Sequence, residues 1–171
     1  MALADTMRPR HLGAQEGDKV RVITDLVTTK AAARDTGEAY SLFELETPTS
    51  GGFPPHVHRY DDEAFYVLDG TYAFLIGEEE IELHPGGYAF APRGTVHGFV
   101  NVGSSTARML VLITPGGIQE SFFQEVGDQA DRPVWEPDMA KVLAVAPKYG
   151  IQFSPSDARK EGKPGEDDWE P

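Results

Sequence analysis

The sequence predicts an all-β domain, either a sandwich or a small barrel, with short helices near its C-terminus. Short stretches alternate apolar and polar residues with the period of two that strands require, and turn residues recur between them about every eight to twelve positions. After residue 115 the apolar spacing changes to the helical period. The length of 171 residues fits one domain with a sizeable core.

Several stretches have the length and composition of strands and are bounded by turn residues. They cover residues 20–23, 39–46, 65–68, 71–76, 79–83, 88–91, 97–100, 108–114 and 151–153. In the second stretch, Ser41, Phe43 and Leu45 are expected on one face, because strand side chains alternate. Asp69-Gly70 separates the third stretch from the fourth and is typical of a hairpin turn.

Two helices are expected after the strands. Ile118, Phe122 and Val126 recur at helical spacing and predict a helix that ends at Gly127. A second helix is expected to open at Pro137, with one side formed by Met139, Val142, Leu143 and Ala146. We therefore expect an irregular arm over residues 1–18, a barrel with its helices over 19–153, and a disordered tail, rich in Pro, Gly and charge, over 154–171.

Charge and composition exclude several functions. The net charge of −13 argues against binding to nucleic acid and to anionic membrane surfaces, both of which need Lys and Arg. No apolar run approaches the ~18 residues of a membrane span, and residues 1–17 have no apolar signal core. A cytoplasmic protein is therefore expected. Because the chain has no cysteine, any metal must be held by His, Asp or Glu.

Three histidines and one glutamate have a spacing that suits a single metal ion. His56 and His58 are two residues apart, so both imidazoles point to one face of a strand. Glu63 begins the next strand, and an adjacent antiparallel pairing would bring it across from them. His97 lies on a later strand that barrel closure can bring alongside. Three imidazoles and a carboxylate suit one divalent first-row metal, namely iron, manganese, cobalt, nickel, copper or zinc.

Taken singly, each of these residues has a simpler interpretation. An isolated His-x-His is common on surface strands, a lone glutamate is usually solvated, and a lone buried histidine is usually a hydrogen-bonded core residue. The combined spacing and strand parity favour the metal site over these alternatives. His11 and His84 fall outside the pattern and are expected to be exposed.

Two motifs in the chain resemble those of the cupin superfamily. The first is His56, His58, Glu63 and Gly70, although Ser50 occupies the place of the motif's leading glycine. The second matches in full, with Gly86, Pro92, Gly94, His97 and Asn101. The resemblance implies a cupin barrel, which is a double-stranded β-helix or jelly roll. It indicates the fold and the metal site, but not the reaction.

The segments Pro54 to His58 and Glu63 to Gly70, with the C-terminal helices, resemble single-domain cupins grouped with quercetin 2,3-dioxygenase. This resemblance implies a metal-dependent dioxygenase that cleaves a flavonol or related polyphenol with O2. Glu63 would then be a catalytic base as well as a ligand. Phe43, Phe65 and Phe99 have inward parity and are expected to line a pocket for a small-molecule substrate, with core packing as the alternative.

Two other function classes stay open at this point. One is a non-oxidative cupin enzyme of small-molecule biosynthesis, namely a cyclase, dehydratase or isomerase that uses the same metal and Glu63. The other is a non-catalytic cupin that binds a metal or a small molecule. Oxygen uptake separates the dioxygenase from both. Tyr66, Tyr72, Phe74 and Ile76 include outward positions with apolar character, so a homodimer is also expected.

Overall fold

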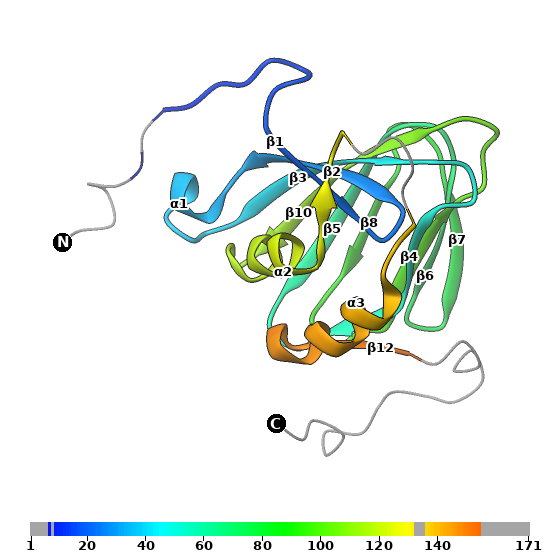
Figure 1. Ribbon diagram of the computed structural model, residues 1–171. Helices are drawn as coiled ribbons and strands as arrows, with labels where there is room; N and C mark the ends of the chain where they lie inside the picture. Colours follow the sequence, from blue (N-terminus) through cyan, green and yellow to red (C-terminus); the bar gives the residue numbers. More distant parts are fainter. Residues whose placement is uncertain (1–6, 8, 132–135, 155–171) are drawn as a thin grey trace.

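The computed structural model describes residue 7 and residues 9–131 and 136–154, as two antiparallel sheets that face each other (Figure 1). The strands are β1 (Asp18–Val22), β2 (Asp25–Ala31), β3 (Ser41–Thr47), β4 (Gly52–His58), β5 (Asp62–Asp69), β6 (Tyr72–Ile76), β7 (Glu79–Leu83), β8 (Tyr88–Ala91), β9 (His97–Asn101), β10 (Ala107–Thr114), β11 (Asp128–Gln129) and β12 (Ile151–Phe153). The helices are α1 (Ala33–Thr36), α2 (Ile118–Val126) and α3 (Met139–Val145), with a 3-10 turn η2 (Ala146–Tyr149). The predicted all-β fold with short helices is confirmed.

One sheet has the strand order β11-β1-β2-β3-β10-β5-β8 and the other has the order β12-β4-β9-β6-β7. Strands that follow each other in the chain therefore often lie in opposite sheets. This arrangement corrects the hairpin expected at Asp69-Gly70, because β5 and β6 belong to different sheets. Gly70 turns the chain from one sheet to the other with a φ of 80°. A Cβ at Gly70 would lie 2.5 Å from Cβ of Ala107, so the crossing is also tight.

The core lies between the sheets. The buried positions of β3 are Ser41, Phe43, Leu45 and Thr47, as their alternation predicts. The opposite sheet contributes a set of packed rings, namely Phe53, Tyr72, Phe74 and Phe99. Of the four residues expected to include outward positions, Tyr72 and Phe74 are buried and so do not supply them. Tyr66 does point outward and is exposed.

The helix α2 covers one open side of the barrel, and Figure 1 shows α3 beside it. Phe123 of α2 packs against Phe43 and Phe53, with ring centroids 5.2 and 6.3 Å apart. α2 spans the predicted range, and Gly127 follows it. Among the described residues, no helix is long and apolar enough to cross a bilayer.

The second helix differs from expectation in its start and in one of its faces. Asp138 is the N-cap of α3 and accepts a hydrogen bond from the backbone N–H of Lys141 at 3.0 Å, so Pro137 precedes the helix. Leu143, expected on the packed side, is exposed, whereas Val142 and Ala146 are buried. The tail expected over residues 154–171 lies outside the described residues except for Ser154, and residues 1–6 and 8 of the expected arm also lie outside them.

Candidate metal centre

The four predicted ligands come together inside the barrel. One donor atom from each of His56, His58, Glu63 and His97 lies within 4.8 Å of the others, and all four side chains are buried. Nε2 of His56 is 3.1 Å from Nε2 of His58, and Oε2 of Glu63 is 2.9 Å from Nε2 of His97. The cluster can therefore bind one metal ion. The structure places His84 on the surface, and His11 is also exposed.

The strand pairing behind this cluster differs in one respect from the expectation. His56 of β4 and His97 of β9 are direct partners across neighbouring strands. Glu63, however, lies on β5 in the opposite sheet, where its partners are Ile113 and Ala91. Its carboxylate reaches the histidines across the barrel interior, because β5 lies in one sheet and β4 and β9 lie in the other.

Backbone carbonyl groups orient two of the three imidazoles. Nδ1 of His56 is 2.8 Å from the carbonyl oxygen of Pro54, and Nδ1 of His97 is 2.8 Å from that of Thr95. A carbonyl only accepts, so each Nδ1 carries a proton and donates it. The neutral rings then direct an unprotonated Nε2 toward the cluster. This tautomer is the one required for metal binding through Nε2.

Pro54 and Pro55 lie where the ladder between β4 and β9 is interrupted, and the carbonyl group of Pro54 accepts the hydrogen bond from His56. The ladder between β4 and β9 pairs Phe53 with Phe99 and then shifts before His56 pairs with His97. Pro54 and Pro55, which have no backbone N–H, occupy the gap. The carbonyl of Pro54 is therefore directed to the imidazole ring.

The contacts within the cluster require a positive charge. With an unprotonated Nε2, His97 would face the carboxylate of Glu63 as one acceptor facing another at 2.9 Å. Such a contact is repulsive unless a proton or a metal cation lies between the two atoms. Three nitrogen donors and one carboxylate fit a divalent first-row metal better than calcium or magnesium, which prefer oxygen. The residues present therefore fit the expected class of metal.

The ionisation of the cluster follows from its contacts. Burial opposes the ionised form of Glu63, but when the ring nitrogens of His58 and His97 that face it carry a proton, their hydrogen bonds outweigh burial and hold the pKa of Glu63 well below its usual range. Burial and the neighbouring His97 lower the pKa of His56 far below its ordinary value. His56 is therefore neutral and Glu63 is ionised, as a ligand set requires. For His58, burial is outweighed by hydrogen bonds with Asp61 and Glu63, which raise its pKa to about 9, so this ring must lose a proton when it binds a metal.

Two residues beside the cluster were not anticipated from the sequence. Gln119 of α2 lies with its amide nitrogen 2.8 Å from Nδ1 of His58, and the same nitrogen is 3.3 Å from Oδ2 of Asp61. Both side chains are buried. Neither residue belongs to a strand that carries a ligand, and no spacing rule connects residue 119 with residue 58.

The three predicted pocket residues are all buried in the aromatic core. Phe65 lies nearest to the cluster, with its ring centroid 6.1 Å from that of His97, and Phe99 packs against Phe65 at 6.0 Å. Phe43 instead packs against Phe123 of α2. Phe53, which the sequence analysis did not single out, also approaches the cluster, at 6.2 Å from His56.

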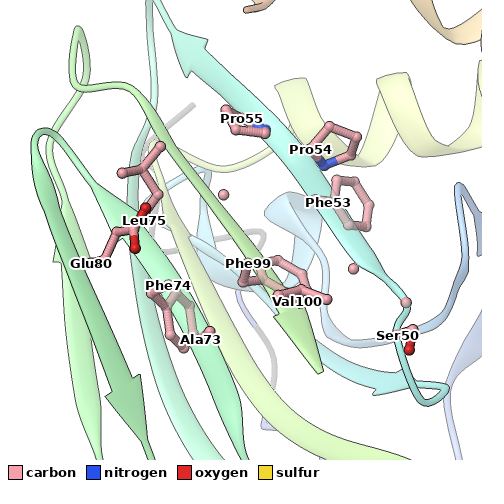
Figure 2. Close-up of a pocket in the computed structure, with 13 residues that line it drawn as sticks. Ser50, Phe53, Pro54, Pro55, Ala73, Phe74, Leu75, Glu80, Phe99 and Val100 are labelled. Carbon is pink, nitrogen blue, oxygen red and sulfur yellow. The ribbon is translucent and has the colours of Figure 1, made fainter. Parts of the chain in front are cut away.

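A separate groove of about 380 Å³ runs over the five-stranded sheet. Figure 2 shows Pro54 and Pro55 on one side of it and Leu75 and Glu80 on the other. Ala73 and Leu75 alternate with the buried Tyr72 and Phe74, so the groove lies on the outer face of this sheet. None of the four candidate ligands lines it.

Comparison with known proteins agrees with this fold and site. The cupin domain family matches residues 43–113, which include all four candidate ligands. The structure of KdgF from Halomonas sp. superposes with a TM-score of 0.59 at 20% identity, over 66% of this chain and 99% of that one. An RmlC-like cupin from Shewanella frigidimarina superposes with a TM-score of 0.56 at 12% identity, over 65% and 95% of the two chains. The chain therefore has the cupin fold, and its residues 43–113 match the cupin domain family.

Within the cupins, the chain resembles the quercetin 2,3-dioxygenase of Bacillus subtilis. The two sequences are 31% identical over 126 residues, which amount to 74% of this chain. The matched region covers 37% of the length of the Bacillus enzyme. The similarity therefore extends over most of this chain and over a little more than one third of that relative.

Proposed function

We propose that this protein is a metal-dependent dioxygenase of the quercetinase-like single-domain type, which cleaves a flavonol or related polyphenol with O2. The observation that carries the proposal is the buried group of three imidazoles and one carboxylate with converging donor atoms. The resemblance to a quercetin 2,3-dioxygenase supports the choice of substrate class. His56, His58, Glu63 and His97 would hold one divalent transition metal.

Glu63 is the proposed base. A bound divalent metal supplies a Lewis acid that stabilises an anionic substrate oxygen. Glu63 is ionised, and its Oε2 lies 2.9 Å from His97 and 3.2 Å from His58, so it can accept the proton of a substrate hydroxyl within the same cluster. The ring of the substrate anion would then be cleaved, with O2 as the oxidant and carbon monoxide as the released fragment.

Phe65 and Phe99 are proposed to contact the planar substrate, and Phe43 to form the far wall of its pocket. The ring centroid of Phe65 lies 6.1 Å from that of His97, and Phe99 packs against Phe65 at 6.0 Å. All three are nearly inaccessible in the described structure. Substrate entry therefore requires that the packing between the barrel and α2 opens, and Phe123 is the residue of α2 that covers Phe43 and Phe53.

Oxygen consumption tests this function. Purified protein loaded with nickel, iron or manganese is mixed with quercetin while dissolved O2 is recorded. We expect metal-dependent uptake, and we expect Glu63→Gln to lose most turnover while keeping much of its metal. Glu79→Gln, which changes an exposed carboxylate in the same way, is the matched control and should react as wild type.

Two results would contradict the proposal. A metal-replete protein that consumes no O2 would favour the non-oxidative enzyme or the binding protein. Turnover of a small molecule without O2 would then point to the cyclase, dehydratase or isomerase class. Unchanged uptake by Glu63→Gln would remove Glu63 from catalysis even if the dioxygenase activity itself is found.

A homodimer is proposed on the outer face of the seven-stranded sheet. Tyr66, Tyr88 and Phe90 are exposed there on the neighbouring strands β5 and β8, and Tyr66 pairs with Tyr88. Exposed aromatic side chains on a sheet edge are typical of an interface. Light scattering of the purified protein measures the mass, and a monomer at micromolar concentration would contradict the dimer. The cytoplasmic location stays a prediction.

A further inference from the structure

The three histidines of the candidate centre are oriented in two different ways. His56 and His97 each donate from Nδ1 to a carbonyl group two residues earlier in the chain, that of Pro54 within β4 and that of Thr95 just before β9. Nδ1 of His58 has no such carbonyl among its described partners. It faces the side-chain amide of Gln119, which is 61 positions later in the chain. The barrel strands therefore orient two imidazoles by themselves, whereas the third depends on α2.

The surroundings of Gln119 leave few other roles for it. Its side chain is 2% exposed, and its amide nitrogen contacts only Nδ1 of His58 and Oδ2 of Asp61 among the described residues. Asp61 is 1% exposed, and its Oδ1 has no hydrogen-bond partner within the described ranges. A buried carboxylate with so little compensation destabilises a fold unless it serves a nearby charge. Oδ2 of Asp61 lies 3.7 Å from the ring of His58.

We infer that Gln119, which lies beside Asp61, is a positioning residue that orients His58 for metal binding. The inference rests on the metal centre proposed above. Partners on the far side of a metal-binding imidazole fix the orientation of its ring and its tautomer, and their removal typically weakens binding about 10–100-fold. Gln119 occupies that place for His58. Its function is exerted through His58 and not on the substrate.

An amide is suited to this position because it offers both a donor and an acceptor. With its nitrogen toward Nδ1, Gln119 serves the tautomer of His58 whose proton is on Nε2. A half-turn of the amide brings its oxygen to the same place, where it accepts a proton from Nδ1 and leaves Nε2 free for a metal. In this second orientation the amide nitrogen no longer donates to Asp61, and the carboxylate of Asp61 instead favours the second tautomer because it attracts the proton on Nδ1.

The position of Gln119 is fixed by the docking of α2. The neighbouring Glu120 accepts hydrogen bonds from the backbone N–H of Ala33, at 2.6 Å, and from the hydroxyl of Ser41. Phe122 and Phe123 are buried on the same helix. Metal binding and α2 docking must therefore be coupled, since each stabilises the arrangement that the other requires.

The affinity for Co²⁺ or Zn²⁺, measured by competition with a chromophoric chelator, tests this inference. Gln119→Met keeps the approximate volume and removes the hydrogen bonds, and we expect it to weaken metal binding about 10–100-fold. Gln124→Met makes the same change at an exposed position of α2 and should bind as wild type. The Co²⁺ absorption spectrum should change in Gln119→Met only, because a change in ligand orientation alters it and a change in stability does not.

A second measurement does not depend on the variants. Hydrogen exchange of the wild type should slow in α2 when Zn²⁺ is added, while the edge strand β7 changes little. The inference would be overturned if Gln119→Met bound metal with the affinity of the wild type, or if added metal left hydrogen exchange in α2 unchanged. Neither result would contradict the metal centre itself. A wild type that binds no metal would overturn the metal centre and the inference together.

Discussion

The barrel holds two buried polar clusters, one at each end of β9. His97 at the start of the strand belongs to the candidate metal centre, and Asn101 at its end belongs to a hydrogen-bonded network. Four residues of a strand separate the clusters by about 13 Å. A layer of aromatic rings lies between them, including Phe99 and Phe74.

At the Asn101 end, the donors and acceptors of the buried side chains are matched. Tyr72 donates to the hydroxyl of Thr47 at 3.0 Å, and Thr47 donates to Oδ2 of Asp25 at 2.8 Å. Asn101 donates to the carbonyl groups of Thr47 and Ser105 and accepts from the backbone N–H of Gly103, all within 2.9 Å. Such a closed network stabilises a fold and has no need of a ligand.

The metal end is the opposite case. There the acceptor atoms of Glu63 and the histidines converge, and only an added cation or proton relieves their repulsion. Both clusters are equally buried, so burial alone does not identify a site. The difference is whether donors and acceptors balance. A buried polar cluster with an excess of acceptors is the one that is built to bind a cation.

The largest expected effect is at the metal end. His58→Ala should lose tight metal binding, by more than the roughly 100-fold that removal of an outer partner causes. Metal content after dialysis is the measurement, and His84→Ala, which removes an exposed histidine, is the control. The closed network should be untouched, so the metal-free variant should still fold. A full complement of metal in His58→Ala would contradict the assigned site.

The next largest effect is at the closed end. Asn101→Ala removes three hydrogen bonds, among them the buried one to the carbonyl group of Thr47, so we expect a loss of about 2–4 kcal/mol in the free energy of unfolding. Urea unfolding of the metal-free protein measures it. Metal affinity per folded molecule should stay as in wild type. A variant with normal stability and weakened metal binding would remove the distinction between the two clusters.

The smallest effect concerns Asp25 in the closed network, whose ionisation makes the free energy of unfolding depend on pH. Burial raises the pKa of Asp25 to about 7, against opposing hydrogen bonds from Thr47 and Thr24. Its contribution to stability is therefore present below about pH 4 and is lost as the pH rises through about 7. Asp25→Asn should reduce this pH-dependent decrease in the free energy of unfolding by a few kcal/mol at most, since each pKa unit is worth about 1.4 kcal/mol. Unfolding curves measured between about pH 5 and pH 8 test this, and an equal slope in both proteins would contradict it.

The sequence was most informative where the spacing within one strand decides the geometry. His56 and His58 share a face because strand side chains alternate, and the same rule placed Phe43 and Leu45 in the core. The rule fails between strands. Neither the pairing partner of Glu63 nor the crossing at Gly70 can be obtained from residues near them, because the partners of β5 are β8 and β10.

The contributions of the C-terminal helices were harder to predict for the same reason. The period of α2 was evident, but which of its polar side chains points inward depends on how the helix docks. Gln119 and Gln124 have the same chemistry and lie on one short helix, yet one is buried against His58 and the other is exposed. Helical spacing places Gln119 on the same face as Phe122, Phe123 and Val126, but only the three-dimensional contact shows that this face meets His58.

The interrupted ladder at Pro54 and Pro55 has a consequence for protein design. A designer who moves this ligand set to another barrel would copy the histidines and the glutamate, and would repair the two prolines as defects. That repair would return the carbonyl of Pro54 to the ladder and leave the ring of His56 without its anchor. Gly98 must be copied together with the two prolines, because a Cβ at this position would lie 2.9 Å from the backbone of Phe53 and Pro55. The smallest unit that can be moved to another barrel is therefore the strand pair β4 and β9, with its ladder still interrupted at Pro54 and Pro55.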